Sequence, residues 1–206
     1  MLSSMSASDR DALRYYLLKQ GGVANDAEFS LDAMHVTRQA DLNARLGNLL
    51  SRATSLALVP DQRWPAPLDD ASRRADVELD AHYAMLTTTP IAFERDVRAL
   101  RIASALQCAI DVLRAADALA TRREPWRQLA AARAVTVRAL LDSLYVALLL
   151  LAPALPHASA IALNRLGLDV AWTQRCGAWR ALDVATVVGG TPFGSVVTLF
   201  PRSDKK

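Results

Sequence analysis

The sequence has few cysteines and histidines, and neither type is clustered. Its two cysteines, Cys108 and Cys176, form no CxxC pair, so the sequence predicts neither a disulfide framework nor a zinc site. The three histidines, His35, His82 and His157, stand apart from one another. An isolated histidine is usually a surface residue or a hydrogen-bonded core residue rather than a metal ligand. We therefore expect no metal site.

Lysine is almost as scarce. Of the 24 basic residues only Lys19, Lys205 and Lys206 are lysines, so arginine carries nearly all the positive charge of a chain whose net charge is +3. The planar guanidinium group suits phosphates and base edges better than an ammonium group does. The composition is therefore compatible with nucleic-acid binding, although biased codon usage explains it equally well.

No apolar run is long enough to cross a bilayer. The most apolar one, "LYVALLLLAPAL" at 144–155, is shorter than the roughly 20 residues required and is interrupted by Pro153. We interpret it as a buried helix and expect no membrane contact. The start of the chain, "MLSSMSAS", has no basic residue before Arg10 and so supports a transit peptide only weakly.

The spacing of apolar residues predicts a bundle of six helices. Ser8 and Asp11 resemble a capping box for a first helix that ends at 21–22. A long helix follows Ser30 and ends near Pro60. The later helices are expected from 70 to 86 where "TTTP" breaks the pattern, over 93–113, from Pro125 through 148, and up to Gly167. The apolar stripe of the long helix is formed by Leu42, Leu46, Leu49, Ala53 and Leu56.

The residues beyond Gly167 lose the helical period and gain glycine, valine and threonine. This change predicts short strands or an irregular tail that packs back on the bundle. No repeat of fixed period is present, which argues against a helical solenoid. The fold class expected is therefore all-α, a helix bundle with a short irregular or β C-terminal tail.

One stretch of the long helix, "RLGNLLSR" at 45–52, combines a glycine with several polar residues. Gly47 costs a helix about 1 kcal/mol relative to alanine, which suggests that another backbone or a ligand approaches it, unless the helix simply tolerates it. Asn48 and Arg52 are one turn apart on the same face. A polar stripe of this kind is, by itself, usually solvated surface. Its members are Arg38, Asp41, Arg45, Asn48, Arg52 and Ser55.

Several short motifs in a fixed order resemble a known family. They are "DALRYYLL" at 11–18, "FS" at 29–30, "ADLNARLGNLLSR" at 40–52, "PW" at 125–126, "APALPHAS" at 152–159, "LG" at 166–167 and "LFPR" at 199–202. The ordered set resembles the C-terminal half of methionyl-tRNA synthetases, the helical anticodon-binding domain. The resemblance implies three parts: 1–22 as a helix that joins a catalytic half, 23–168 as the anticodon-binding domain, and 169–206 as a tail packed on it.

The resemblance also implies the site residues. In this family the asparagine and arginine of the Asn-Leu-x-Ser-Arg helix and the tryptophan of the Pro-Trp pair contact the anticodon, and these positions are Asn48, Arg52 and Trp126 here. Such groups suit RNA, because splayed bases of a loop can stack on aromatic rings and form hydrogen bonds along their edges. Without the resemblance, Trp126 would be read as a core or interface residue. The candidate phosphate contacts are Arg45, Arg122, Arg123 and Arg127.

The chain departs from the family pattern in two places. Where the family commonly has Asn-x-Tyr before the Pro-Trp pair, this sequence has Asp117, Ala118 and Leu119, and an aspartate facing the anticodon loop would weaken the attraction to RNA. The His-x-Gly-His and Lys-Met-Ser-Lys-Ser motifs of the catalytic half do not occur. We therefore expect no aminoacylation by this chain alone and no cofactor in it, since ATP and methionine would bind the absent catalytic domain.

The function expected is that of a tRNA-binding module that recognises the methionine anticodon, CAU. Its partner would be the anticodon stem-loop of tRNA(Met), with a separate catalytic chain or a truncated gene accounting for the missing half, and with neither DNA nor membrane as a partner. The mitochondrial matrix is the expected compartment and the cytoplasm the alternative. The alternative function is a helical scaffold, descended from a synthetase, that binds proteins and not RNA.

Overall fold

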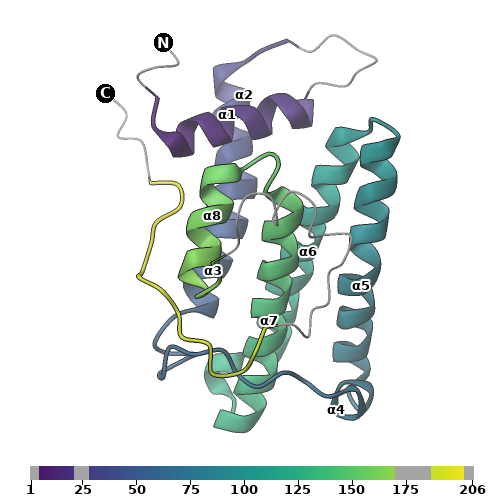
Figure 1. Cartoon of the computed structure of the whole chain (residues 1–206), viewed down its shortest axis with the longest axis vertical. Coiled ribbons are helices and arrows are strands. Elements are labelled where there is room, and N and C mark those ends of the chain that lie inside the picture. The colour runs from purple at the N-terminus through teal and green to yellow at the C-terminus, as the bar shows by residue number, and fades with distance from the viewer. Residues whose placement is uncertain (1–4, 21–27, 170–186, 202–206) are drawn as a thin grey trace.

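The computed structural model describes residues 5–20, 28–169 and 187–201, and in these ranges the chain forms a helical bundle (Figure 1). No strand is present in these ranges, and the only β-type pairing is an isolated antiparallel bridge between Arg63 and Pro192. The all-α prediction is confirmed. The elements in chain order are α1 (Ala7–Gln20), α2 (Leu31–Thr37), the π-helix η2 (Arg38–Gly47), α3 (Asn48–Ala53), α4 (Asp70–Arg74), α5 (Val77–Arg98), α6 (Ile102–Arg123), the 3-10 turn η3 (Pro125–Arg127), α7 (Ala130–Leu151) and α8 (Pro156–Arg165).

Helix α7 forms the centre of the bundle. It packs against α6, α5, α3 and α8, and nearly every residue from Thr136 to Leu151 is buried. The helix is long and apolar enough to cross a membrane by composition, but 83% of its most apolar window is buried inside the protein. This is the environment of a buried core helix, as predicted for the run at 144–155.

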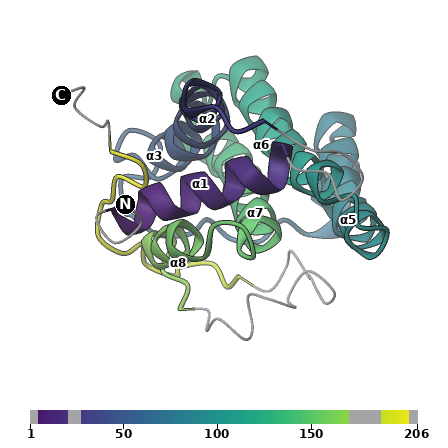
Figure 2. The ribbon, with the colours of Figure 1, turned by 90° about the horizontal axis from the view of Figure 1, so that it is seen from above.

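Helix α1 lies across one end of the bundle and contacts α6 and α8 (Figures 1 and 2). Its cap lies two residues before the predicted one: Ser6 Oγ accepts from Asp9 N at 3.1 Å and donates to the Asp9 carboxylate at 2.7 Å. Asp11 is buried and instead accepts from His157 N and Ala158 N in the first turn of α8. Asp11 therefore ties α1 to the positive end of α8 and does not cap its own helix.

The long second helix is real but is divided in three. The Leu42, Leu46 and Leu49 stripe is fully buried, as predicted. The helix ends at Ala53, earlier than the predicted end near Pro60, and Leu56 lies in the following turn with 68% of its surface exposed. Its middle part, η2, is a π-helix, a wider turn that often occurs at functional sites.

Helix α5 runs through "TTTP", where the sequence predicted a break. The hydroxyls of Thr87, Thr88 and Thr89 donate to the carbonyls of Tyr83, Ala84 and Met85 at 2.8–2.9 Å. These bonds run to the carbonyl four residues earlier, as serine and threonine side chains often do in helices, and none of them reaches Leu86 O, the carbonyl that Pro90 leaves without its backbone donor. Pro90 is buried inside the helix, whose packing against α6 and α7 outweighs the cost of the proline.

The break lies instead between α5 and α6, inside the helix predicted over 93–113. Arg101 N donates to Asp96 O at 2.8 Å and Leu100 N to Val97 O at 3.0 Å, which is a Schellman motif. Leu100 occupies the left-handed position, with φ of 58°, that glycine usually takes. The sequence gives no glycine signal at this turn, and the prediction was wrong for that reason.

Pro125 does not open the next long helix. It begins the single turn η3, after Glu124 in a left-handed conformation, and α7 starts only at Ala130. Trp126 therefore lies on a tight turn between α6 and α7. A short loop presents a side chain outward more readily than the buried face of a helix does.

The tail that the structure describes, residues 187–201, packs back on the bundle as an irregular chain, which we term the C-terminal strap (Figure 1). Phe193 N donates to Gln62 O and Gly194 N to Arg165 O. Gly167 ends α8 with φ of 75°, and a Cβ atom there would lie 1.9 Å from Pro192 O, so only glycine allows this approach. The rest of the predicted tail, residues 170–186 and 202–206, lies outside the described residues.

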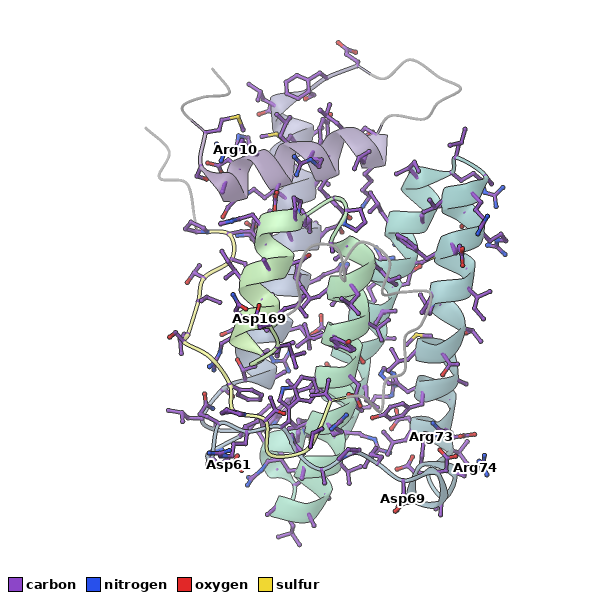
Figure 3. All side chains as sticks on the ribbon, in the orientation of Figure 1. Arg10, Asp61, Asp69, Arg73, Arg74 and Asp169 are labelled. Carbon is purple, nitrogen blue, oxygen red and sulfur yellow. The ribbon has the colours of Figure 1, made fainter. Side chains whose placement is uncertain are left out.

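Helix α4 carries opposite charges at its two ends. It is capped by Asp69, whose carboxylate accepts from Ser72 N at 2.6 Å, and it has Arg73 and Arg74 in its last turn, at one end of the molecule (Figure 3). Opposite charges at the two ends of a helix complement its dipole.

Candidate nucleic-acid interface

Two of the predicted site residues are in contact. Trp126 on η3 keeps 48% of its surface exposed, and the guanidinium carbon of Arg52 on α3 lies 5.6 Å from the centre of its ring. This distance is within the range of a cation–π interaction. The result is an indole face and a permanent positive charge beside each other at the surface, contributed by segments more than 70 residues apart in the sequence.

Asn48 and Arg45 extend this surface along the same helical face. Asn48 precedes Arg52 by one turn and is exposed, and Arg45 precedes Asn48 by three residues. Arg45 is half-buried and its closest carboxylate is that of Asp41, at 3.9 Å. We term Asn48, Arg52 and Trp126 the platform.

Asp117, the residue that departs from the family pattern, lies at the edge of the platform. Its carboxylate is 3.7 Å from Arg52 Nη1, and its side chain is 27% exposed. Burial raises its pKa, while Arg52 and Arg45 lower it. The sequence identified this aspartate as a departure but not its pairing with Arg52, which depends on how α6 packs beside α3.

Arg122 and Arg123 are held by the start of α5. Both donate to the carboxylate of Glu78, and Arg123 donates also to Asp76, the cap of α5. The side chain of Arg123 is only 17% exposed. Their positive charge is thus largely compensated within the protein, and their first role is to join the end of α6 to the start of α5.

Arg127 differs from this pair. It follows Trp126 directly, its side chain is 72% exposed, and in the part of the chain that the structure describes it pairs with Glu124 alone, at 2.9 Å. Exposed pairs three residues apart contribute little free energy and exchange partners easily. Of the four candidate phosphate contacts, Arg127 is therefore the most exposed one, and it lies next to Trp126 in the chain.

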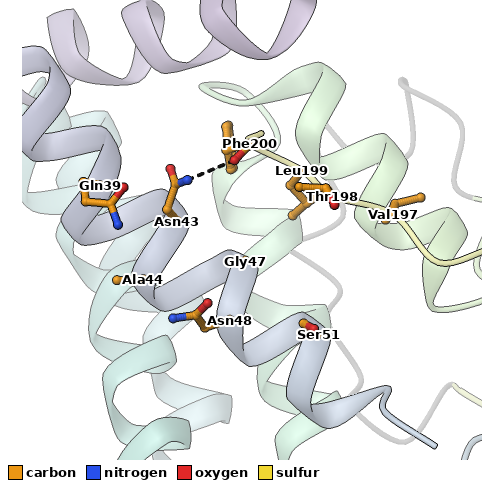
Figure 4. Close-up of a pocket in the computed structure, with 10 residues that line it drawn as sticks. All are labelled: Gln39, Asn43, Ala44, Gly47, Asn48, Ser51, Val197, Thr198, Leu199 and Phe200. Carbon is orange, nitrogen blue, oxygen red and sulfur yellow. Dashed lines mark hydrogen bonds between the residues drawn. The ribbon is translucent and has the colours of Figure 1, made fainter. Parts of the chain in front are cut away.

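A polar pocket of about 340 Å³ borders the platform (Figure 4). It lies between the second helix and the C-terminal strap, and Gly47, where the sequence suggested a close approach, forms part of its wall. The lining residues are Gln39, Asn43, Ala44, Gly47, Asn48, Ser51, Val197, Thr198, Leu199 and Phe200. The sequence did not predict the pocket, because four of its ten lining residues come from the tail, whose place beside the second helix depends on tertiary packing.

No group of three or more histidine, cysteine, aspartate or glutamate side chains that would hold a metal ion is found in the part of the chain that the structure describes.

The N-terminal quarter of the chain matches a family of tRNA synthetases. The family described as "tRNA synthetases class I (M)" matches residues 2–54, which include α1 and the whole second helix. The match therefore covers Asn48 and Arg52 of the platform.

Curated relatives extend this similarity along the chain. The mitochondrial methionine–tRNA ligase of Xenopus laevis is 29% identical over 167 residues, which are 76% of this chain and 29% of that protein. That of Takifugu rubripes is 29% identical over 181 residues, covering 80% and 30% of the two chains. A bacterial methionine–tRNA ligase, from Thermosynechococcus vestitus, is 26% identical over 171 residues. The chain spans about three tenths of the length of these relatives.

Solved structures show the same fold. The apo methionyl-tRNA synthetase of Mycobacterium tuberculosis superposes with a TM-score of 0.79 at 24% identity, over 99% of this chain and 42% of that one. The same enzyme in complex with methionyl-adenylate gives 0.77 at 26% identity, over 93% and 37%.

Proposed function

We propose that this chain, which is related to the class I methionyl-tRNA synthetases and has the fold of their C-terminal region, binds the anticodon stem-loop of a methionine tRNA. The observation that carries the proposal is the contact between Arg52 and the half-exposed ring of Trp126. An unpaired base would stack on the indole, the Arg52 guanidinium would bind a base edge or a phosphate, and the Asn48 amide would donate and accept at a base edge.

The shape of the platform supports a single-stranded ligand rather than a duplex. A loop base that is already unstacked loses little stacking energy when it lies on an aromatic ring, and its edge is free for hydrogen bonds. Arg127, which directly follows Trp126, and Arg45, which precedes Asn48 by three residues, would bind the flanking phosphates. The short reach of the platform suits a few loop nucleotides.

The test is the affinity of the chain for an RNA stem-loop that carries the CAU anticodon. We expect Trp126→Ala to weaken binding by about 1–3 kcal/mol, or roughly 5- to 150-fold, and Trp126→Phe to weaken it much less because a ring remains. Leu129→Ala is the matched control, since Leu129 is 85% exposed, lies three residues away and is not aromatic.

Two outcomes would contradict the proposal. Equal affinity for a stem-loop with a scrambled anticodon would remove the anticodon specificity. Unchanged affinity in Trp126→Ala would remove the platform, and would favour the alternative of a protein-binding scaffold. Binding to phosphates weakens steeply with salt, so the salt dependence separates an RNA site from a protein site.

Aminoacylation needs groups outside the residues described above. We propose that this chain contributes tRNA binding, and that ATP and methionine bind a catalytic domain supplied elsewhere. The purified chain is expected to show no methionine-dependent exchange of pyrophosphate into ATP. Measurable exchange would contradict this division of roles.

We place the protein in the mitochondrial matrix. Several similar curated proteins are named as mitochondrial, among them those of Xenopus laevis and Schizosaccharomyces pombe, while bacterial ligases also match. Fractionation of the source cells tests the compartment.

A further inference from the structure

The pocket beside the platform has the chemistry of a site for an uncharged polar ligand. Its side chains offer amides from Gln39, Asn43 and Asn48 and hydroxyls from Ser51 and Thr198, and no charged side chain lines it. At about 340 Å³ it lies at the lower end of the volumes of ligand sites, which run from roughly 300 to 1,000 Å³. It therefore suits a small planar group rather than a large cofactor or a phosphate.

One lining residue has an unused acceptor. Asn43 Nδ2 donates to Phe200 O at 2.9 Å, while its Oδ1 is buried and accepts no hydrogen bond from any residue that the structure describes (Figure 4). A buried acceptor without a donor costs about 1–3 kcal/mol.

The facing wall has unused backbone groups as well. Residues 195–199 of the C-terminal strap neither donate nor accept a backbone–backbone hydrogen bond within the described ranges. The strap is held instead from its ends, by Arg165 Nη1 at Gly194 O and by Arg38 Nη2 at Pro201 O. The wall thus keeps its position while its N–H and C=O groups stay available.

The helical wall is open because of Gly47. This residue ends the π-helix η2, and a side chain there would enter the pocket. A Cβ atom would meet only Leu42 O, at 3.4 Å, an ordinary contact, so the backbone itself does not require glycine. The space in front of Gly47 is what a larger residue would remove.

We propose that this pocket binds a second unpaired nucleobase of the same RNA, held by hydrogen bonds to its edge. Asn48 belongs both to the lining of the pocket and to the platform, so the two lie next to each other. A base has both donors and acceptors along its edge, which match the amides and hydroxyls of the lining and the backbone groups of the strap. The inference rests on the proposed function, because the RNA strand must reach the pocket from Trp126.

The experiment combines Gly47→Leu with stem-loops in which each unpaired nucleotide is made abasic in turn. Leucine fills the pocket and has the better helix propensity, so the variant is expected to fold, as circular dichroism would verify. We expect Gly47→Leu to weaken binding of the intact loop about tenfold, which corresponds to one good base contact of about 1.4 kcal/mol. We expect one abasic position to weaken RNA binding by the wild type but not by Gly47→Leu. A different abasic position should weaken RNA binding by the wild type but not by Trp126→Ala.

Two further variants test whether the effect of Gly47→Leu comes from the loss of space in the pocket. Ser51→Leu reduces the pocket from another position and is expected to act like Gly47→Leu. Thr88→Leu, an exposed change on α5 away from the pocket, is the matched control and is expected to bind as the wild type does.

The failure of this inference is distinct from that of the proposed function. If the loop binds through Trp126 and Gly47→Leu binds as the wild type, the pocket proposal is wrong and the platform stands. If Gly47→Leu weakens all loops by one factor, with no position singled out, the pocket does not hold a base. If the wild type binds no stem-loop, both proposals are wrong.

Discussion

The arginines of this protein occupy two contrasting regions. Under the C-terminal strap, Arg138 and Arg165 are 1% and 5% exposed and use their guanidinium groups within the protein. On the platform, Arg52 has a side chain 46% exposed, and among the described residues it forms one ion pair, with Asp117 at 3.7 Å. Arginine thus forms buried hydrogen bonds that join segments in one region and is an exposed cation in the other. The number of fixed hydrogen-bond and ion-pair partners decides which of these two roles an arginine has.

The buried region is a hydrogen-bonded network. Arg138 Nε donates to Asp142 at 3.0 Å and Nη1 to the carbonyls of Pro65 and Val187, while Tyr83 donates to the same carboxylate at 2.6 Å. Arg165 donates only to neutral oxygens, among them Thr54 O and Gln62 Oε1, and burial lowers its pKa. These contacts attach the strap and the loop around Trp64 to helices α7 and α8.

The largest expected effect is on the buried side of this comparison. Arg138→Ala leaves the Asp142 carboxylate buried without its cation, and breaking such a pair typically costs about 3–5 kcal/mol. Urea unfolding followed by circular dichroism would measure the loss. Arg127→Ala, which breaks an exposed pair, is the control and is expected to cost less than about 1 kcal/mol. Equal losses would erase the distinction between the two regions.

The next effect concerns pH and the core beside this network. His82 is buried, and Ser143 Oγ donates to Ala139 O at 2.7 Å, so His82 Nε2 donates to that hydroxyl at 2.8 Å. Burial lowers the pKa of His82 from 6.5 to about 4, with Arg122 and Arg123 lowering it further and Glu78 opposing them. Between these pH values the unfolded chain binds a proton that the folded chain does not.

The contribution of His82 to stability is therefore complete above about pH 6.5 and is lost as the pH falls towards 4, by up to roughly 3 kcal/mol. Unfolding free energies at pH 7 and pH 4.5 measure it. In His82→Gln, whose amide can still donate to Ser143, we expect a smaller loss over this range. If the unfolding free energy of His82→Gln depends on pH as strongly as that of the wild type, a group other than His82 causes the pH dependence.

On the platform we expect effects on binding and not on folding. Arg52→Gln should weaken the binding of the CAU stem-loop by about 1–2 kcal/mol, roughly 5- to 30-fold, because it removes a cation beside the stacked base. Its unfolding free energy should stay within about 0.5 kcal/mol of the wild type. A large loss of stability would show that Arg52 stabilises the fold, as Arg138 does.

The smallest expected effect sharpens the role of Asp117. Asp117→Asn keeps the shape, removes a negative charge near the RNA and releases Arg52 from its ion pair. We expect RNA affinity to rise a few-fold at low salt and less at high salt, because the gain is electrostatic. Weaker binding would instead mean that Asp117 orients Arg52 for the base.

Sequence pattern predicted the elements where the signal is local. The leucine stripe, the buried helix at 144–155 and the end of α8 at Gly167 all follow from the spacing of apolar residues and a glycine stop. The prediction of helix boundaries was wrong where the boundary depends on contacts between residues far apart in the sequence, or where a turn does not contain the residue type that usually marks it. Helix α5 continues through Pro90 because it packs against α6 and α7, and Leu100 takes a position that usually belongs to glycine.

The platform shows the same limit. The ordered motifs identified Asn48, Arg52 and Trp126 as candidates, but neither composition nor spacing could predict that Arg52 lies over the indole ring. Nor could they predict that Arg122 and Arg123 are paired with the start of α5. The four candidate phosphate arginines look alike in the sequence.

The sequence by itself determined that this chain is a helical bundle, that Leu42, Leu46 and Leu49 lie in its core, and that Asn48 and Arg52 share an exposed face of the second helix. These properties depend on periodicity, and a helix imposes its period on the chain wherever it forms. The sequence did not determine that Arg38 and Asp41, predicted on the same polar stripe, are buried, or that Ser55 lies beyond the end of the helix. Tertiary structure alone decided which arginines are free, how the π-helix and the strap enclose a pocket, and where the indole lies. Those outcomes depend on partners far apart in the sequence, which only the packing of the helices brings together.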